Sequence, residues 1–253
     1  MKRLLPLAFA LFLVGCKGPQ GPAGPIGNQG NPGTGLQTFT ITFRNGVSPT
    51  TSYSGTSMNR VESGTANTSY AFDGTLLVKS STADISRVLI RFDLLNWIPS
   101  NATITGAALE LVTDTSTSLG STTTVGVHNM SIPVMVDTGS CIWNPSATWN
   151  AYGPTFWSAC SGPGAFTPVY NYDATPIDTV SCTTALNGTN TRLAWNITPA
   201  IVQKWVATPA KNNGLVLTSE NEGANTAGSI VFVAQNNPAW PNLPNLVVTY
   251  YVP

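Results

Sequence analysis

The stretch RVLIRFDL, residues 87–94, alternates apolar and polar side chains and decides the fold class of this chain. Side chains two residues apart point to the same face of an extended strand. One face of the stretch is therefore apolar, with Val88, Ile90, Phe92 and Leu94, and the opposite face carries the charged residues Arg87, Arg91 and Asp93. The pattern predicts a β-strand with one buried face and one face turned to solvent. We interpret Arg91 and Asp93 as an ordinary ion pair on the outer face.

Further short segments have the composition of strands, at residues 38–43, 107–113, 123–130, 192–195, 214–218, 230–233 and 246–252. Clusters of Ser, Thr, Asn, Gly and Pro separate them, which is typical of turns. Many short strands joined by turns favour an all-β fold, and we predict a jelly-roll-type β-sandwich. The chain from residue 36 onward is long enough to bury one core.

One short helix is predicted to begin at Thr198-Pro199. Threonine is a favoured N-cap residue, and proline is favoured at the first helical position. An apolar stripe follows, formed by Ile201, Val202, Trp205 and Val206. We expect this helix to close one end of the sandwich, with Trp205 and Trp195 in or against the core.

The N-terminus has the pattern of an export signal. Lys2 and Arg3 precede an apolar run at residues 4–14, which is too short to cross a hydrocarbon core of about 30 Å as a helix. The boundary Leu13-Val-Gly-Cys16 resembles the lipobox of bacterial lipoproteins, which implies that Cys16 is diacylated and becomes the mature N-terminus. We expect residues 1–15 to be a signal peptide and Cys16 to anchor the exported protein at the outer membrane or cell surface. An ordinary secretory signal with an incidental cysteine is the alternative.

A collagen-like segment follows, with glycine at every third position from Gly18 to Gly33. Only glycine fits at the axis of three wound polyproline-II chains, so a collagen triple helix requires this phase. The run is short, and two alternatives stay open: a single extended, semi-rigid stalk, or a triple helix that makes the protein a homotrimer. In both cases residues 16–35 act as a spacer between the membrane and the domain at residues 36–253.

The charge balance excludes one class of partner. Only 9% of the residues are charged, compared with about 25% in an average soluble protein. The chain has 11 basic residues, of which Lys2 and Arg3 belong to the export signal, and 11 acidic residues. Because this balance does not attract phosphate backbones, we expect no nucleic-acid partner.

Three cysteines remain once Cys16 is assigned to the lipid, namely Cys141, Cys160 and Cys182. An odd number in an oxidising compartment predicts one disulfide and one leftover thiol. The sequence does not fix the pair, and Cys141 with Cys160 is our first choice because it would close an aromatic-rich loop. The spacing of these cysteines and of the single His128 fits no zinc motif. The sequence indicates no cofactor, and it leaves open whether a structural calcium is bound.

Several blocks of the chain resemble the DNRLRE-domain family. The most specific are RVLIRFDL at residues 87–94 and IPSNATI at 98–104, and ATWN at 147–150, WNIT at 195–198 and LVVTY at 246–250 follow in the same order. The resemblance implies an extracellular jelly-roll β-sandwich related to carbohydrate-binding modules, some of which bind alginate. This chain departs from the family near Asn59-Arg60, where the leading Asp of the name motif is absent, and in an insertion at residues 158–190.

The sequence does not favour an enzyme. Glycoside hydrolysis needs two placed carboxylates, and a hydrolytic triad needs a nucleophile beside a histidine. The acidic residues are scattered, and the chain has neither a G-x-S-x-G elbow nor an H-E-x-x-H helix. His128 alternates with apolar residues in a strand-like segment, so we place it on the solvent face of a strand. We assign no catalytic residue.

A binding module needs less chemistry. Sugar recognition uses aromatic rings that stack on pyranose rings, with polar side chains nearby for the hydroxyl groups. Residues 143–157 combine several aromatic residues with turn residues, as in a surface loop. The candidate carbohydrate-binding residues are Trp149, Asn150, Tyr152 and Trp157, together with Arg91 for an acidic sugar. Trp149 has a competing structural explanation, as a clamp that holds the loop on the sandwich.

Two functions stay open. The first is a lipoprotein, at the cell surface or facing the periplasm, that binds polysaccharide or a matrix glycan without cleaving it. The second is a structural or adhesive surface protein that assembles through protein–protein contacts, as a trimer aligned by the Gly-x-y stalk. Aromatic residues in loops favour the first function, and the stalk and the low charge favour the second.

Overall fold

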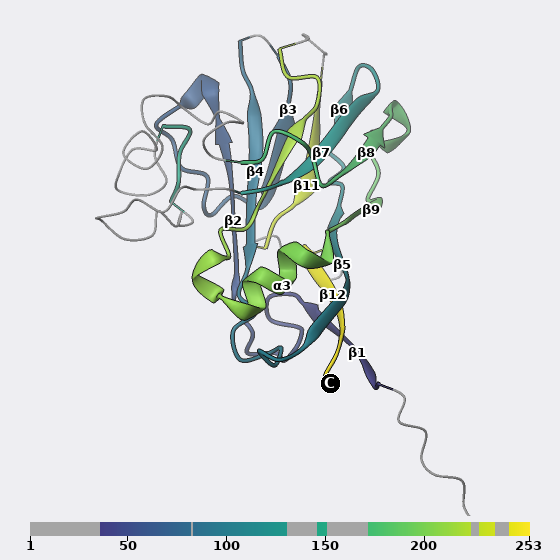
Figure 1. Ribbon diagram of the computed structural model, residues 1–253. Coiled ribbons are helices and arrows are strands. Elements are labelled where there is room, and N and C mark those ends of the chain that lie inside the picture. Colours follow the sequence, from purple (N-terminus) through teal and green to yellow (C-terminus); the bar gives the residue numbers. More distant parts are fainter. Residues whose placement is uncertain (1–35, 82, 131–145, 151–171, 224–227, 236–242) are drawn as a thin grey trace, which may run out of the picture. The chain divides into compact units, whose positions relative to one another are not determined.

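The described chain consists mainly of antiparallel β-strands. The computed structural model describes residues 36–81, 83–130, 146–150, 172–223, 228–235 and 243–253, which belong to one unit, Leu36–Pro253 (Figure 1). Its strands are β1 (Thr38–Phe43), β2 (Thr56–Glu62), β3 (Thr75–Lys79), β4 (Ser86–Phe92), β5 (Thr103–Val112), β6 (Ser118–Leu119), β7 (Thr123–Asn129), β8 (Asp178–Cys182), β9 (Arg192–Asn196), β10 (Leu215–Ser219), β11 (Gly228–Val233) and β12 (Asn245–Tyr251). The helical elements are α3 (Pro199–Ala207) and the short 3₁₀ turns η1 (Ser63–Thr65), η2 (Thr184–Leu186) and η3 (Pro209–Lys211).

The strands form two sheets. One sheet has four strands in the order β1-β12-β5-β9. The other has eight strands, in the order β6-β11-β3-β4-β10-β7-β8 with β2 paired to β4. This arrangement confirms the predicted all-β, sandwich-like character of the chain.

The main core contains the apolar face predicted for residues 87–94. Val88, Ile90 and Phe92 of β4 are at most 1% exposed. Trp195 of β9 is fully buried as predicted, and its indole nitrogen donates to the carbonyl oxygen of Val125 at 2.9 Å. The main core therefore joins β4 and β9, which belong to different sheets.

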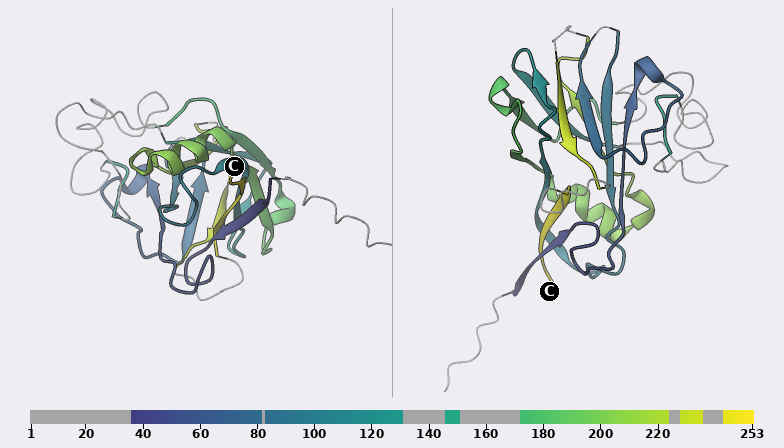
Figure 2. Two further views of the ribbon diagram at one scale, coloured as in Figure 1. Left: turned by 60° about the horizontal axis from the view of Figure 1, so that its bottom comes forward. Right: turned by 180° about the vertical axis from the view of Figure 1, so that it is seen from behind.

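The predicted helix is present as α3, with Thr198 at its N-cap position. The N-cap position was predicted correctly, and the Thr198 side chain makes no capping hydrogen bond. Val202, Trp205 and Val206 are buried against the main core. Figures 1 and 2 show α3 lying across the strands near one end of the unit.

Four strands have no counterpart in the sequence prediction: β2, β3, β6 and β8. Strand β2 illustrates the reason, because its sequence TSMNRVE lacks a clean alternation. Asn59 and Glu62 are polar, yet both are buried. Here the neighbouring strand, and not the local pattern, determines the extended conformation.

Candidate functional site

Two of the described candidate residues, Arg91 and Trp149, lie on the outer face of the eight-stranded sheet, which is turned away from the main core. On β4 the side chains of Arg87, Leu89 and Arg91 point to this face, because the residues between them belong to the core. The register aligns Leu89 with residues of the neighbouring strands, namely Asn59, Val216 and His128. The outer face is therefore a continuous surface built from β2, β4, β10 and β7.

Much of this outer face is covered. A second hydrophobic cluster lies on it, made of Val61, Leu89, Met130, Ala147, Tyr172 and Val216, with Trp149 packed against it. Residues 146–150 form the covering segment on this face. Asn59 Nδ2 donates to the Ala147 carbonyl at 2.6 Å and so holds this segment on β2. Arg87 is only 4% exposed. The prediction that this face of the strand is turned to solvent was wrong for Arg87, because residues distant in sequence pack on it.

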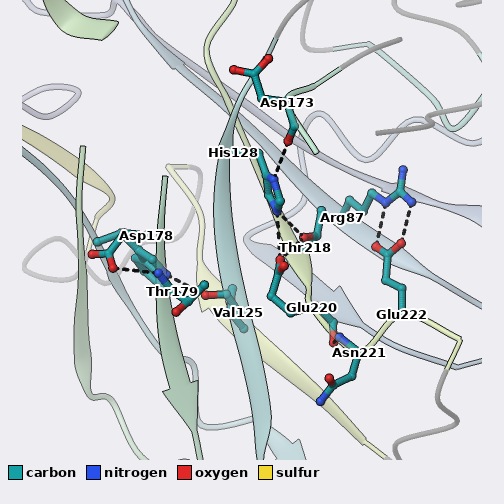
Figure 3. A network of polar contacts seen from close by, with 12 residues as sticks. Arg87, Val125, His128, Asp173, Asp178, Thr179, Thr218, Glu220, Asn221 and Glu222 are labelled. Atoms are coloured by element: carbon teal, nitrogen blue, oxygen red, sulfur yellow. Dashed lines mark hydrogen bonds and ion pairs between the residues drawn. The ribbon is translucent and has the colours of Figure 1, made fainter. Parts of the chain in front are cut away.

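Arg87 forms a charged cluster beneath the cover (Figure 3). Its Nε and Nη2 donate to the two carboxylate oxygens of Glu222 at 2.8 and 2.6 Å. The guanidinium carbon lies 4.9 Å from the ring centroid of Trp149 and 5.4 Å from that of Tyr172. The bidentate bonds and the two cation–π contacts compensate this charge for the water that it loses on burial.

His128 is also buried, at 2% exposure, so its predicted place on a solvent face was wrong. Its Nδ1 lies 2.8 Å from the carbonyl oxygen of Asp173, and its Nε2 lies 2.9 Å from Glu220 Oε1 and 3.0 Å from Thr218 Oγ1. The imidazole meets the ring of Tyr172 edge-on at 4.9 Å. Every polar atom of the ring has a partner, which favours a structural role over a catalytic one.

The surroundings of His128 lower the pKa of Glu220. Burial acts to raise the pKa of its carboxyl group, but hydrogen bonds from His128 and Thr218 and the charge of His128 act against burial. The net result is a pKa below the ordinary value of 4.5. Glu220 is therefore held in its charged form in the folded protein.

Trp149 and Asn150 are both engaged in contacts within the protein. Trp149 is half-buried and lies over the Arg87 guanidinium, as expected for a clamp between loop and sheet. Asn150 Nδ2 donates to Asn67 Oδ1 at 2.8 Å, and its backbone nitrogen donates to the Ala66 carbonyl. The other two loop candidates, Tyr152 and Trp157, lie outside the described residues.

Arg91 lines an open pocket of about 310 Å³ at the end of β4. The lining residues that the structure describes are Ser54, Gly55, Ser57, Arg91, Asp93, Pro209 and Asn212. Burial lowers the pKa of Arg91, whereas the charge of Asp93 acts to raise it. Neither Trp149 nor Asn150 is among these lining residues, so the structure separates Arg91 from the other described candidates.

The walls of the Arg91 pocket have defined polar geometry. Asp93 Oδ1 accepts from the backbone nitrogen of Leu95 at 2.9 Å, which fixes the orientation of the carboxylate. Asn212 is 7% exposed and its Nδ2 donates to the Phe92 carbonyl. Its buried Oδ1 has no hydrogen-bond partner among the residues that the structure describes. Gly214 has φ +84°, and a Cβ there would come within 2.9 Å of Arg91 Cβ. Because Gly214 has no Cβ, its backbone can lie this close to Arg91, and the Arg91 side chain can occupy the pocket wall.

A second pocket of about 300 Å³ shares Pro209 with the Arg91 pocket. Trp97 and Trp205 contribute aromatic surface to it, and the chain from Leu94 to Ser100 forms much of its wall. Sequence reasoning missed Trp97, Pro209 and Asn212 as site residues. The one available signal was Trp97 itself, an aromatic residue in the turn directly after the strand of residues 87–94.

The structure describes only one of the cysteines on which a prediction was made. Cys182 is a free thiol at 0% exposure in the main core, and burial raises its pKa to about 12. Cys141 and Cys160, the predicted disulfide pair, lie outside the described residues, as does the predicted lipidation site Cys16. The buried thiol of Cys182 is consistent with its role as the leftover cysteine.

The described residues contain neither a cluster of metal ligands nor a membrane-spanning helix. No group of three or more His, Cys, Asp or Glu side chains within these ranges is placed to hold a metal ion. None of the helices described is long and apolar enough to span a membrane. Comparison of the sequence with protein-family models gives no match, and comparison with curated proteins gives none either.

Proposed function

We propose that this protein is an exported lipoprotein whose all-β domain binds a polysaccharide without cleaving it. The Arg91 pocket carries the proposal. It combines a guanidinium, a carboxylate, two serine side chains and an amide, which together can donate to and accept from sugar hydroxyl groups. The guanidinium can also pair with the carboxylate of a uronic acid through two parallel hydrogen bonds.

Asn212 Oδ1, which has no hydrogen-bond partner within the described part of the chain, supports a ligand in this pocket. A buried acceptor without a partner costs roughly 1–3 kcal/mol. Asn212 both lines the pocket and carries such an atom. This oxygen is closed to solvent, so a sugar hydroxyl would remove the cost only after a rotation of the Asn212 side chain toward the pocket.

Aromatic surface lies next to these polar groups. Trp97 lines the adjoining pocket, and Pro209 belongs to both walls. An aromatic ring offers a flat apolar surface to the C–H face of a pyranose. The adjoining polar and aromatic walls are the kind of surface that binds linked sugar units.

The composition of the pocket favours binding over cleavage. Among the lining residues that the structure describes, Asp93 is the one carboxylate. Retaining and inverting glycoside hydrolases both use two facing carboxyl groups. Asp93 Oδ1 also accepts a hydrogen bond from the backbone nitrogen of Leu95, which fixes the orientation of this carboxylate.

The finer assignments belong to the same proposal. Four of the five blocks that resemble the DNRLRE-domain family fall on or overlap β4, β5, β9 and β12, so a jelly-roll sandwich of that kind fits the strands observed. We propose that residues 1–15 are a signal peptide, that Cys16 carries the lipid anchor, and that residues 16–35 hold the domain away from the membrane. The protein then acts at the outer membrane or cell surface.

Calorimetric titration with neutral and uronic-acid oligosaccharides tests the proposed function. Arg91→Gln is expected to weaken binding of an acidic sugar by about tenfold or more, because a charged bidentate contact is lost. Tyr152→Ala and Trp157→Ala are expected to lose about 1–2 kcal/mol of binding free energy each. Arg192→Gln is the matched control, since it removes a positive charge from β9 in the other sheet. Absence of binding across a broad sugar panel would refute the function.

A further inference from the structure

Exposed apolar side chains gather at the beginning of β1. Among the described residues the large exposed hydrophobic side chains are Leu36, Phe39, Phe72 and Leu95. Leu36 is 57% exposed and Phe39 is 37% exposed, and only two residues separate them in the sequence. The Phe39 ring stacks on Tyr250 of β12, with ring centroids 5.5 Å apart. Tyr250 itself is only 9% exposed and belongs to the main core, so we call Leu36 and Phe39 the N-terminal apolar patch.

The patch lies at an edge of the fold. β1 is the edge strand of the four-stranded sheet and pairs only with β12 among the described strands. Thr38 is aligned with Tyr251, so the beginning of β1 lies beside the C-terminal end of the chain (Figures 1 and 2). The unpaired side of an edge strand is a common site of association with another chain.

Charge does not oppose association at this edge. The sequences of β1 and β12, TFTITF and NLVVTYY, contain no charged residue. Edge strands are usually protected from association by charged side chains, lysine above all. The first strand of this domain lacks that protection.

The sequence before β1 identifies the partner. Glycine occupies every third position up to Gly33, and Leu36 follows three residues later. A collagen triple helix joins three chains in parallel, so it would bring three copies of Leu36 close together. We propose that the N-terminal apolar patch is the contact surface between three copies of this chain, and that it holds together the short triple helix that precedes it.

Neither half of this assembly is sufficient alone. Two exposed side chains per copy offer far less surface than the roughly 800 Å² per partner of a stable interface. A triple helix of a few triplets is likewise too short to persist. Linking two weak contacts in one chain raises the effective concentration of the second, and the combined affinity can exceed either one by about 10²–10⁴-fold. The proposal goes beyond polysaccharide binding and does not depend on it.

The molar mass of the full chain, purified in mild detergent and measured by light scattering across a dilution series, tests the proposal. A trimer is expected for the wild type. Leu36→Glu combined with Phe39→Glu, and separately Gly24→Ala in the stalk, are each expected to raise the concentration at which the trimer dissociates by about 100-fold or more. Phe72→Glu is the matched control, because Phe72 is 89% exposed but far from the stalk in sequence, and its trimer should be unchanged.

A wild type that is monomeric or dimeric at every concentration would overturn the proposal. A trimer that survives the double substitution would overturn it as well, because the patch would then not be the contact. Near-UV circular dichroism checks that the double variant is folded. If it is not, Leu36→Glu alone replaces it, since Leu36 precedes β1 and takes part in no strand pairing.

Discussion

Arg87 and Glu222 form a bidentate ion pair, with bonds of 2.8 and 2.6 Å, although they are 135 positions apart in the sequence. Arg87 belongs to β4, and Glu222 follows β10, which pairs with β4. The pair thus fixes the turn after β10 onto the outer face of the sheet. The rings of Trp149 and Tyr172 cover the guanidinium, so the pair also anchors the covering segment.

Removal of the charge on Glu222 is expected to destabilise the fold. Glu222→Gln leaves the Arg87 guanidinium buried without its counter-charge, and breaking a buried pair in this way costs about 3 kcal/mol or more. Urea denaturation of the variant measures the loss. The matched control is Glu110→Gln, whose partner Arg192 has a side chain 40% exposed, and it should cost less than about 1 kcal/mol. Equal losses in the two variants would contradict the role assigned to Arg87.

Glu220 is expected to make the stability depend on pH in the acid range. Its pKa in the folded protein is lowered, so its contribution is fully present above the ordinary value of 4.5 and disappears as the pH falls through the lower folded value. The denaturant concentration at the unfolding midpoint, measured from neutral pH downward, should therefore begin to decrease once the pH is lower than about 4.5. Glu220→Gln should reduce this dependence, whereas Glu110→Gln serves again as the control. A wild type and a Glu220→Gln variant with parallel acid profiles would refute the prediction.

The cysteines are expected to fall into two classes. Cys182 should react with an alkylating agent only after unfolding, because its thiol is buried and the reactive thiolate is disfavoured by its raised pKa. Cys141 and Cys160 should be joined, a bond that would stabilise the fold by about 3 kcal/mol in the chain-entropy model. Mass spectrometry of peptides alkylated before and after unfolding distinguishes the classes. Three alkylated cysteines in the native, exported protein would contradict the assignment.

Cys16 is expected to hold the protein on a membrane. Cys16→Ala removes the side chain that would carry the acyl chains. The buried methylenes of these chains supply the free energy of membrane binding, so the protein should move from the membrane fraction to the soluble fraction. Cys182→Ala controls for the loss of any one cysteine. Unchanged partition of Cys16→Ala would show that another part of the chain makes the attachment.

Local pattern predicted a substantial part of this fold. The alternation in residues 87–94 correctly identified β4 and its core face, and the Thr198-Pro199 pair correctly placed the start of α3. These signals succeed because backbone conformation and the periodicity of side chains are properties of a few neighbouring residues. Strand β2 was missed for the same reason, since its buried Asn59 gives no apolar alternation.

The candidate site was much less accessible from the sequence. The charge of Arg91 and the aromatic content of residues 143–157 suggested sugar binding, but they did not indicate which residues would line a pocket. The Arg91 pocket is assembled from the start of β2, the end of β4 and the residues around η3, which are far apart in the chain. Asn212 enters it because its amide reaches the carbonyl of Phe92, a contact between residues 120 positions apart.

The sequence alone therefore determined that this is an all-β chain, which face of β4 enters the core, and where its one described α-helix begins. Tertiary structure decided what covers the opposite face of β4, and so turned Arg87 and His128 from expected surface residues into buried ones. The physical reason is that periodicity reports which side chains share a face, whereas burial depends on what packs against that face. For Arg87 that partner is Glu222, and only the pairing of β4 with β10 brings the two together.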